Sequence, residues 1–245
     1  MMSDNARRVL TALAVSFCAS SANAQDELTL STRTLDALVH VVAHEIGHAV
    51  LREFDLPVLG PEEAIADDFA TVYVQLMFPD RAEAIVSARA DQDIADNEET
   101  EPFSEYIDDD WRAGRSVCVL YGLDPERYAG LRDRYGMDED DASNCEDLAP
   151  EVGRSWRRII ENYRMPKGVR VTEAYFAGDD IPLTTFIVNS QLSEDAGTML
   201  RAIDWHSQIT LAVEACEGSG GWSRNGRRIT ICDTYVERFE RQLGQ

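Results

Sequence analysis

The chain has 245 residues, 44% of them apolar, and a formal net charge of −22 at pH 7. The apolar fraction is that of a globular protein and excludes a disordered chain. The acidic charge argues against nucleic acid as a partner, because binding phosphates requires Lys and Arg. The length suits a single domain, which we place at residues 25–245.

Residues 1–24 are expected to be a cleaved signal peptide. A positively charged start precedes the apolar run Val9 to Ala19, and an A-x-A cleavage site ends at Ala24. The run is too short to span a bilayer, and Phe17 before Cys18 does not suit a lipoprotein signal. We therefore expect an exported protein, periplasmic or secreted, with no stable membrane anchor.

Four cysteines follow the predicted cleavage site: Cys118, Cys145, Cys216 and Cys232. An even number in an oxidising compartment suggests two disulfides, for which three connectivities are possible. We favour the pairing that is local in sequence, Cys118–Cys145 and Cys216–Cys232. A second zinc site is the alternative reading, but no close CxxC pair supports it.

Apolar periodicity, capping residues and helix breakers divide the chain into a helical half, 25–164, and a sheet-bearing half, 165–245. Helices are predicted over about 32–54, 61–78, 81–94, 105–120, 125–135 and 150–163, with acidic loops at 96–102 and 137–149. The second half is predicted to hold strands at 169–176, 181–188, 209–216 and 228–232 and helices at 194–205 and 233–243. Turn signals place a loop between the last two strands. The predicted fold class is therefore α+β.

The first helix carries the motif His44-Glu45-Ile46-Gly47-His48. Residues four apart lie roughly 40° apart around a helix, so His44 and His48 share one face. Two imidazoles so placed can bind one tetrahedral cation, and Glu45 can reach a water on that cation. This is the metalloprotease arrangement, with two His as zinc ligands and Glu45 as general base. His40 lies one turn earlier, but no Glu follows it, so we interpret His40 as structural.

A catalytic zinc needs three protein ligands and one open position. Glu63, on the next helix, is the candidate for the third ligand, and Glu62 is the runner-up. The short connection makes the two helices antiparallel neighbours, which brings Glu63 toward His48. Asp67 lies one turn beyond Glu63 and can accept the free ring N–H of a zinc-bound His. The alternative is that these acids serve only the helix N-terminus.

HExxH followed by Glu-x-x-x-Asp on the next helix resembles the gluzincins, the thermolysin-like zinc peptidases. A closer resemblance, over roughly residues 33–163, is to a family of bacterial secreted metallopeptidases that is still largely a domain of unknown function. It is carried by His44 to Phe69, which includes Leu56-Pro57-Val58-Leu59-Gly60, and by Cys118 to Pro125. The resemblance implies a zincin-like fold, one zinc ion and a peptide or protein substrate.

The chain departs from this family in two ways. Relatives usually carry a His before the first Cys, where this chain has Phe103-Ser-Glu-Tyr106. Tyr106 or the distant His206 is therefore a candidate for facing the developing oxyanion. Relatives also usually carry a strand–Cys–loop–Trp–strand–Cys segment before the zinc helix, whereas the similar segment Ile209 to Tyr235 follows it here. This order suggests a circular permutation.

These observations favour hydrolysis of a peptide bond by a zinc-activated water, with residues 211–216 as a possible edge strand that aligns the substrate. One alternative is a non-catalytic zinc-bearing binding or structural module, in which His206 or Asp204 supplies a fourth ligand. Another is hydrolysis of a non-protein amide, such as a cell-wall peptide link. The oligomeric state is not predicted.

Overall fold

The structure is a computed structural model, which describes residues 29–97, 107–166, 175–178, 183, 186–187 and 189–244. The predicted signal peptide lies outside the described residues. The helices are α1 (Thr32–Glu53), α2 (Glu62–Met77), α3 (Ala82–Asp96), α4 (Asp109–Leu123), α5 (Gly130–Tyr135), α6 (Glu139–Asn162), α8 (Gln191–Arg201) and α9 (Asp233–Leu243). The strands are β1 (Tyr175–Gly178), β2 (Thr210–Glu214), β3 (Gly220–Ser223) and β4 (Arg228–Cys232). The predicted α+β class is confirmed.

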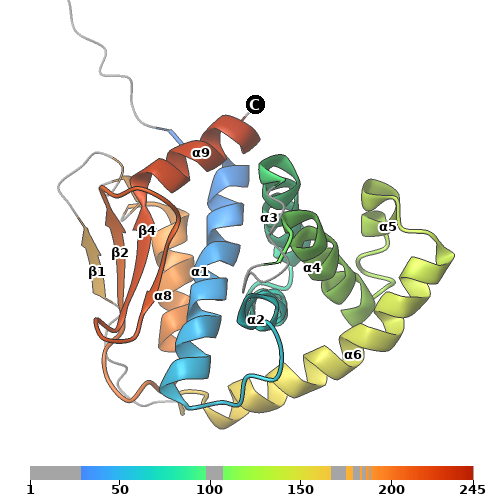
Figure 1. Ribbon diagram of the computed structural model, residues 1–245, viewed down its shortest axis with the longest axis horizontal. Coiled ribbons are helices and arrows are strands. Elements are labelled where there is room, and N and C mark those ends of the chain that lie inside the picture. The colour runs from blue at the N-terminus through green and yellow to red at the C-terminus, as the bar shows by residue number, and fades with distance from the viewer. Residues whose placement is uncertain are drawn as a thin grey trace, which may run out of the picture.

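Helix α1 runs through the middle of the molecule (Figure 1). It contacts α2 and α3 on one side and α8, α9 and the strands β3 and β4 on the other. Side chains on nearly all of its faces are buried, as expected for a helix enclosed by neighbours. Ser31 caps its start by accepting from the Thr34 backbone N–H, and a left-handed Asp55 follows its end. The HExxH motif therefore sits on the most enclosed element of the fold.

Helices α1 and α2 approach closely at Gly47, between the two motif histidines. A Cβ at residue 47 would lie 3.0 Å from the Phe69 ring and 3.3 Å from the Ala66 backbone. A larger residue would push α2 away from the face that carries His44 and His48. The glycine in the motif thus sets the distance between the histidines and the acids of α2.

The predicted acidic loop over 137–149 is wrong, because α6 begins at Glu139 and continues through Pro150. Asp138 accepts from the Asp141 backbone N–H, and the Asp141 side chain accepts from the Asp138 N–H, a reciprocal cap that starts the helix. Cys145 faces inward from this first part of α6 toward α4. The many acids there occupy the solvent side of an amphipathic helix rather than a loop.

The strands form one mixed sheet with the order β1-β2-β4-β3. Strands β1, β2 and β4 are parallel, and β3 pairs antiparallel with β4, with Gly221 opposite Thr230. Sequence reasoning placed a loop where β3 lies. It also predicted that residues 211–216 form an edge strand. This prediction is wrong, because β2 lies between β1 and β4, and the strands at the two edges of the sheet are β1 and β3.

The strand predicted over 181–188 is also wrong where the structure describes it. Leu183, Phe186 and Ile187 are helical. Leu183 and Ile187 are buried and lie four residues apart, so they share one helical face. The remaining residues of that prediction lie outside the described part of the chain, as do most of those in the strand predicted at 169–176.

Two disulfides, Cys118–Cys145 and Cys216–Cys232, confirm the predicted connectivity and exclude the second zinc site. The first joins α4 to α6, and the second joins the end of β4 to the segment between β2 and β3. None of the described helices combines the length and the apolar character that a membrane span needs.

Packing between α4 and α6 generates a first prediction, that Gly122→Ala is strongly destabilising. A Cβ at residue 122 would lie 2.0 Å from the Cys145 carbonyl oxygen. Overpacking of this kind costs about 1–3 kcal/mol, so we expect the free energy of unfolding in urea to fall by about that amount. Gly114→Ala, on the same helix, is the control, because nothing lies within 4 Å of its Cβ position. That control should gain up to about 1 kcal/mol, and equal losses in both variants would contradict the close contact.

Candidate metal centre

His44, His48 and Glu63 converge on one point between α1 and α2. The Nε2 atoms of the two histidines are 3.0 Å apart. The Glu63 carboxylate lies 3.1 Å from His44 Nε2 and 3.4 Å from His48 Nε2. No other His, Cys, Asp or Glu among the described residues belongs to this group. The structure therefore brings together the three side chains that the sequence selected.

The outer nitrogen of each histidine is held by a second carboxylate. His44 Nδ1 donates to Asp67 Oδ1 at 2.7 Å, and His48 Nδ1 donates to Glu62 Oε1 at 3.0 Å. A carboxylate can only accept, so each Nδ1 carries a proton, and the two Nε2 atoms face each other. The bond from His44 to Asp67 was expected, whereas Glu62, the runner-up ligand, occupies the equivalent outer position on His48.

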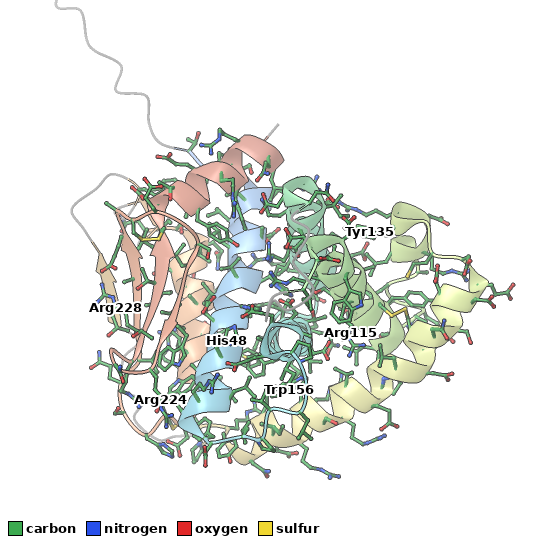
Figure 2. The ribbon with its side chains drawn as sticks, in the orientation of Figure 1. His48, Arg115, Tyr135, Trp156, Arg224 and Arg228 are labelled. Carbon is green, nitrogen blue, oxygen red and sulfur yellow. A yellow bond between two sulfur atoms is a disulfide. The ribbon has the colours of Figure 1, made fainter. Side chains whose placement is uncertain are left out.

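Three arginines pair with acids of α2, two of them with the carboxylates that hold the histidines, and sequence reasoning missed all three. Arg112 on α4 donates to both Asp67 oxygens, at 2.8 and 3.0 Å. Arg115, one turn along α4, pairs with Asp68 in the same two-pronged way at 2.8 Å, and it is labelled in Figure 2. Arg52 at the end of α1 donates through Nε to Glu62 Oε1 at 3.2 Å. Arg112 and Arg115 are three residues apart, which indicates only that they share one face of a helix. No local sequence pattern indicates that this face packs against α2.

The protonation of the cluster follows from these contacts. Burial lowers the pKa of His44, but the charge of Asp67 and the hydrogen bonds to Asp67 and Glu63 outweigh burial and raise that pKa to about 9. Burial also lowers the pKa of His48, but the hydrogen bond to Glu63 contributes to a net increase in that pKa. Burial favours a higher pKa for Glu63, but its hydrogen bonds to both histidines lower it. At neutral pH a positive charge is thus favoured between the imidazoles, as a proton or as a metal cation.

Glu45 lies in the cleft that opens over this cluster. The cleft has a volume of about 520 Å³, and Glu45, His48, Glu62 and Glu63 are among the residues that line it. Its opposite wall is strand β3, where the Cβ position of Gly221 is 3.8 Å from Glu45 Oε2. Because residue 221 has no side chain, the space beside the Glu45 carboxylate stays open.

The other histidines lie apart from the cluster. His40 is fully buried, its Nε2 lies 3.2 Å from Thr71 Oγ1, and burial lowers its pKa to about 3. It does not belong to the metal-ligand group, in agreement with the structural interpretation. His206 is exposed and packs edge-on against Phe54, with 5.1 Å between ring centroids. Tyr106 lies outside the described residues.

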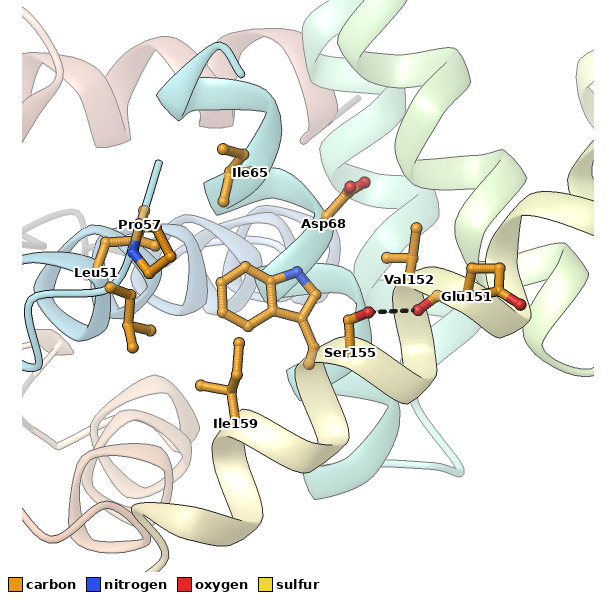
Figure 3. A pocket seen from close by; sticks show the side chains of 10 residues that line it. Leu51, Pro57, Ile65, Asp68, Glu151, Val152, Ser155 and Ile159 are labelled. Atoms are coloured by element: carbon orange, nitrogen blue, oxygen red, sulfur yellow. Dashed lines mark hydrogen bonds between the residues drawn. The ribbon is translucent and has the colours of Figure 1, made fainter. Parts of the chain in front are cut away.

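A second cavity, of about 360 Å³, lies between α6, α2 and the end of α1. Figure 3 shows its apolar side chains, among them Leu51, Ile65 and Ile159. Its lining residues are different from those of the metal cleft. It has no cluster of titratable groups that could do chemistry, so we place the functional site at the cleft over His44 and His48.

The pairing of Asp67 generates a second prediction, for the metal-free protein. Asp67→Asn removes the charge shared by His44 and Arg112, which leaves the largely buried Arg112 guanidinium with only the more distant Asp109, at 3.9 Å, as a counter-charge. Breaking a buried pair in this way costs about 3–5 kcal/mol, measured as the free energy of unfolding in urea. Asp68→Asn is the matched control, because the Asp68–Arg115 pair is partly exposed, and such pairs contribute about 1 kcal/mol or less. A control as destabilised as Asp67→Asn would refute the special role of Asp67.

Comparison with known proteins agrees with this geometry. The sequence profile of one family, DUF4344, matches residues 9–160, well over half of the chain, and that family is described as "Putative metallopeptidase". No curated protein and no solved structure matches the chain. The matched region contains the motif helix, the acids of α2 and both arginines of α4. The chain therefore belongs to this metallopeptidase family.

Proposed function

We propose that the protein is a gluzincin-like zinc peptidase in which His44, His48 and Glu63 bind one zinc ion and Glu45 is the general base. The observation that carries this proposal is the convergence of two Nε2 lone pairs and one carboxylate beside a cleft that also contains Glu45. Two imidazole nitrogens and a carboxylate that face one another with their lone pairs repel one another unless a cation lies between them.

The spacing of the three ligand atoms suits zinc. Ligands about 2.0–2.1 Å from a tetrahedral ion stand about 3.3–3.4 Å apart. The separations here are 3.0, 3.1 and 3.4 Å. Two imidazoles and one carboxylate also form a ligand set that catalytic zinc uses, with one position left open. The donor set and its spacing therefore both fit the ion.

Asp67 and Glu62 prepare the two histidines for this role. By accepting the Nδ1 protons, they fix both tautomers with Nε2 free and raise the basicity of the ligating nitrogens. Arg112 holds Asp67, and Arg52 holds Glu62. The ring orientations are thus set before an ion arrives, which lowers the cost of assembling the site.

A bound zinc ion supplies Lewis-acid polarisation of the scissile carbonyl and lowers the pKa of a bound water. Glu45, in the same cleft, would take a proton from the attacking water at its carboxylate and give it to the leaving amine. Strand β3 lines the cleft on the other side and has one free edge in the sheet. An extended peptide aligned along β3 would pass beside Glu45 with little obstruction at Gly221.

A non-catalytic zinc module is less well supported. Such a site needs a fourth protein ligand, and the described residues offer none within the group. His206 packs on Phe54, and Asp204 is exposed beside Tyr163. Family membership favours a peptide bond over another amide.

Three further assignments go with this proposal. Residues 25–245 form one zincin-like domain, preceded by a signal peptide over 1–24. Export to the periplasm or medium agrees with the two disulfides. Circular permutation relative to other family members stays a prediction, and the contacts of β3 and β4 with α1 meet its requirement that this segment lie beside the motif helix.

Zinc binding gives a third prediction. Glu63→Ala should weaken zinc binding by more than about 100-fold, because a direct ligand is lost, while Glu62→Ala should weaken it by about 10–100-fold, as the loss of an outer partner does. Competition against a zinc chelator measures both. Because binding displaces the proton on His44, the wild-type affinity should rise with pH up to about 9. The reverse order of the two variants would make Glu62 the ligand.

Loss of the general base gives a fourth prediction. Glu45→Gln should keep one zinc ion and the wild-type fold while kcat falls by at least about 100-fold, since a general base contributes about 10²–10⁴-fold. Hydrolysis of a mixed peptide library, read by mass spectrometry, measures the rate, and metal analysis measures zinc. Glu237→Gln, an exposed residue of α9, is the control and should have full activity. Undiminished turnover in Glu45→Gln would falsify the base assignment.

A further inference from the structure

The hairpin of β3 and β4 forms the wall of the cleft opposite the motif helix, and three arginines lie at its turn. Arg227 pairs with Glu53 at the end of α1. Arg228 pairs with Glu214 on β2. These two ion pairs fasten the turn to the helix and to the sheet, so both arginines are accounted for by structure.

Arg224 is different from its two neighbours. It is exposed, it lines the cleft together with His48 and Glu63, and none of the described acids is seen paired with it. Figure 2 shows His48 on α1 and Arg224 at the nearby end of the hairpin. The turn that carries Arg224 is fixed by Arg227, so its guanidinium is presented at the cleft rather than on a free loop.

Two of the three acids that line the cleft, Glu63 and Glu62, already have partners, and none of the ion pairs among the described residues joins Arg224 to the third, Glu45. Glu63 faces the two imidazoles, and Glu62 receives both His48 and Arg52. A cation at the cleft wall is therefore left to pair with an anion brought by a bound molecule. Because the whole chain carries a net charge of −22, its long-range field repels anions. At physiological salt that field is screened beyond about 8 Å, so such an anion must be held by direct contact.

We propose that Arg224 binds a carboxylate of the substrate and thereby selects acidic peptides. This inference rests on the proposed peptidase function and names its substrate class. A guanidinium matches a carboxylate with two parallel N–H···O bonds, which a lysine cannot reproduce. The carboxylate comes from an Asp or Glu side chain near the cleaved bond or from the C-terminus of the peptide, and the experiment separates these two sources.

The test uses the zinc-loaded full chain and three matched peptides. The first has an internal Glu, the second has Gln in its place, and the third is the Gln peptide with an amidated C-terminus. The first and second peptides differ only in the side-chain carboxylate, and the second and third differ only in the C-terminal carboxylate. In one of these two pairs, we expect the wild type to cleave the peptide that has the carboxylate with a kcat/KM at least tenfold higher, and we expect the difference to lie in KM. The pair that differs identifies the source of the carboxylate.

Three variants make the assignment specific. Arg224→Gln should abolish the preference for the peptide with the carboxylate, and Arg224→Lys should restore part of it. Arg158→Gln, an exposed residue of α6, removes the same charge elsewhere and should keep the full preference. A preference that survives in Arg224→Gln, or a wild type that treats all three peptides alike, overturns the inference.

A binding measurement separates this inference from the peptidase proposal. Fluorescence anisotropy of the same labelled peptides on Glu45→Gln, with and without Arg224→Gln, reads recognition without turnover. Tighter binding of the acidic peptide that depends on Arg224, with no cleavage by the wild type, supports the carboxylate site and contradicts the peptidase. Cleavage without any preference in rate or binding supports the peptidase and contradicts the site.

Discussion

The two Nε2 atoms of His44 and His48, turned toward each other at 3.0 Å, are the constraint around which the fold is arranged. Each imidazole is locked in that orientation by a carboxylate behind it, and each carboxylate is locked by an arginine. The chain His44–Asp67–Arg112 joins α1, α2 and α4, so three helices share one polar contact in a largely apolar core. Such a network is stable only when every member is paired, and Asp67 completes it with three hydrogen bonds.

The parts of this site that could be predicted from sequence depend on short chain separations. His44 and His48 belong to one helix, so their common face follows from helical geometry. Glu63 and Asp67 lie on the next helix, and a short connection leaves little choice of packing. The two disulfides were predictable for the same reason, since each joins cysteines that are near in sequence. The terminal helix over 233–243 also matches its prediction, because its amphipathic pattern is strong.

The parts that could not be predicted depend on contacts between distant segments. Strand β3 contains two glycines, which have low strand propensity, and it exists because β4 pairs with it. The first turns of α6 were hidden by acids and by Pro150, although Asp138 and Asp141 do carry a capping signal. The contact between Arg112 and Asp67 spans 45 residues, and no local pattern encodes it. The charge of an arginine does not show whether it is paired within the fold or available to a ligand. Only the contacts of its guanidinium in the folded protein show this.

The hydrogen bond that joins His44 to Asp67, and through Asp67 to α4, has a consequence for the stability of the protein. An ion that binds the folded cluster and not the unfolded chain adds RT ln(1 + [ion]/Kd) to stability, about 4 kcal/mol at a thousandfold excess over Kd. Metal supply and resistance to degradation are therefore thermodynamically linked. Under the proposed function, a copy of the protein without its ion has less of this stability, because His44 and Asp67 belong both to the surroundings of the ion and to the core.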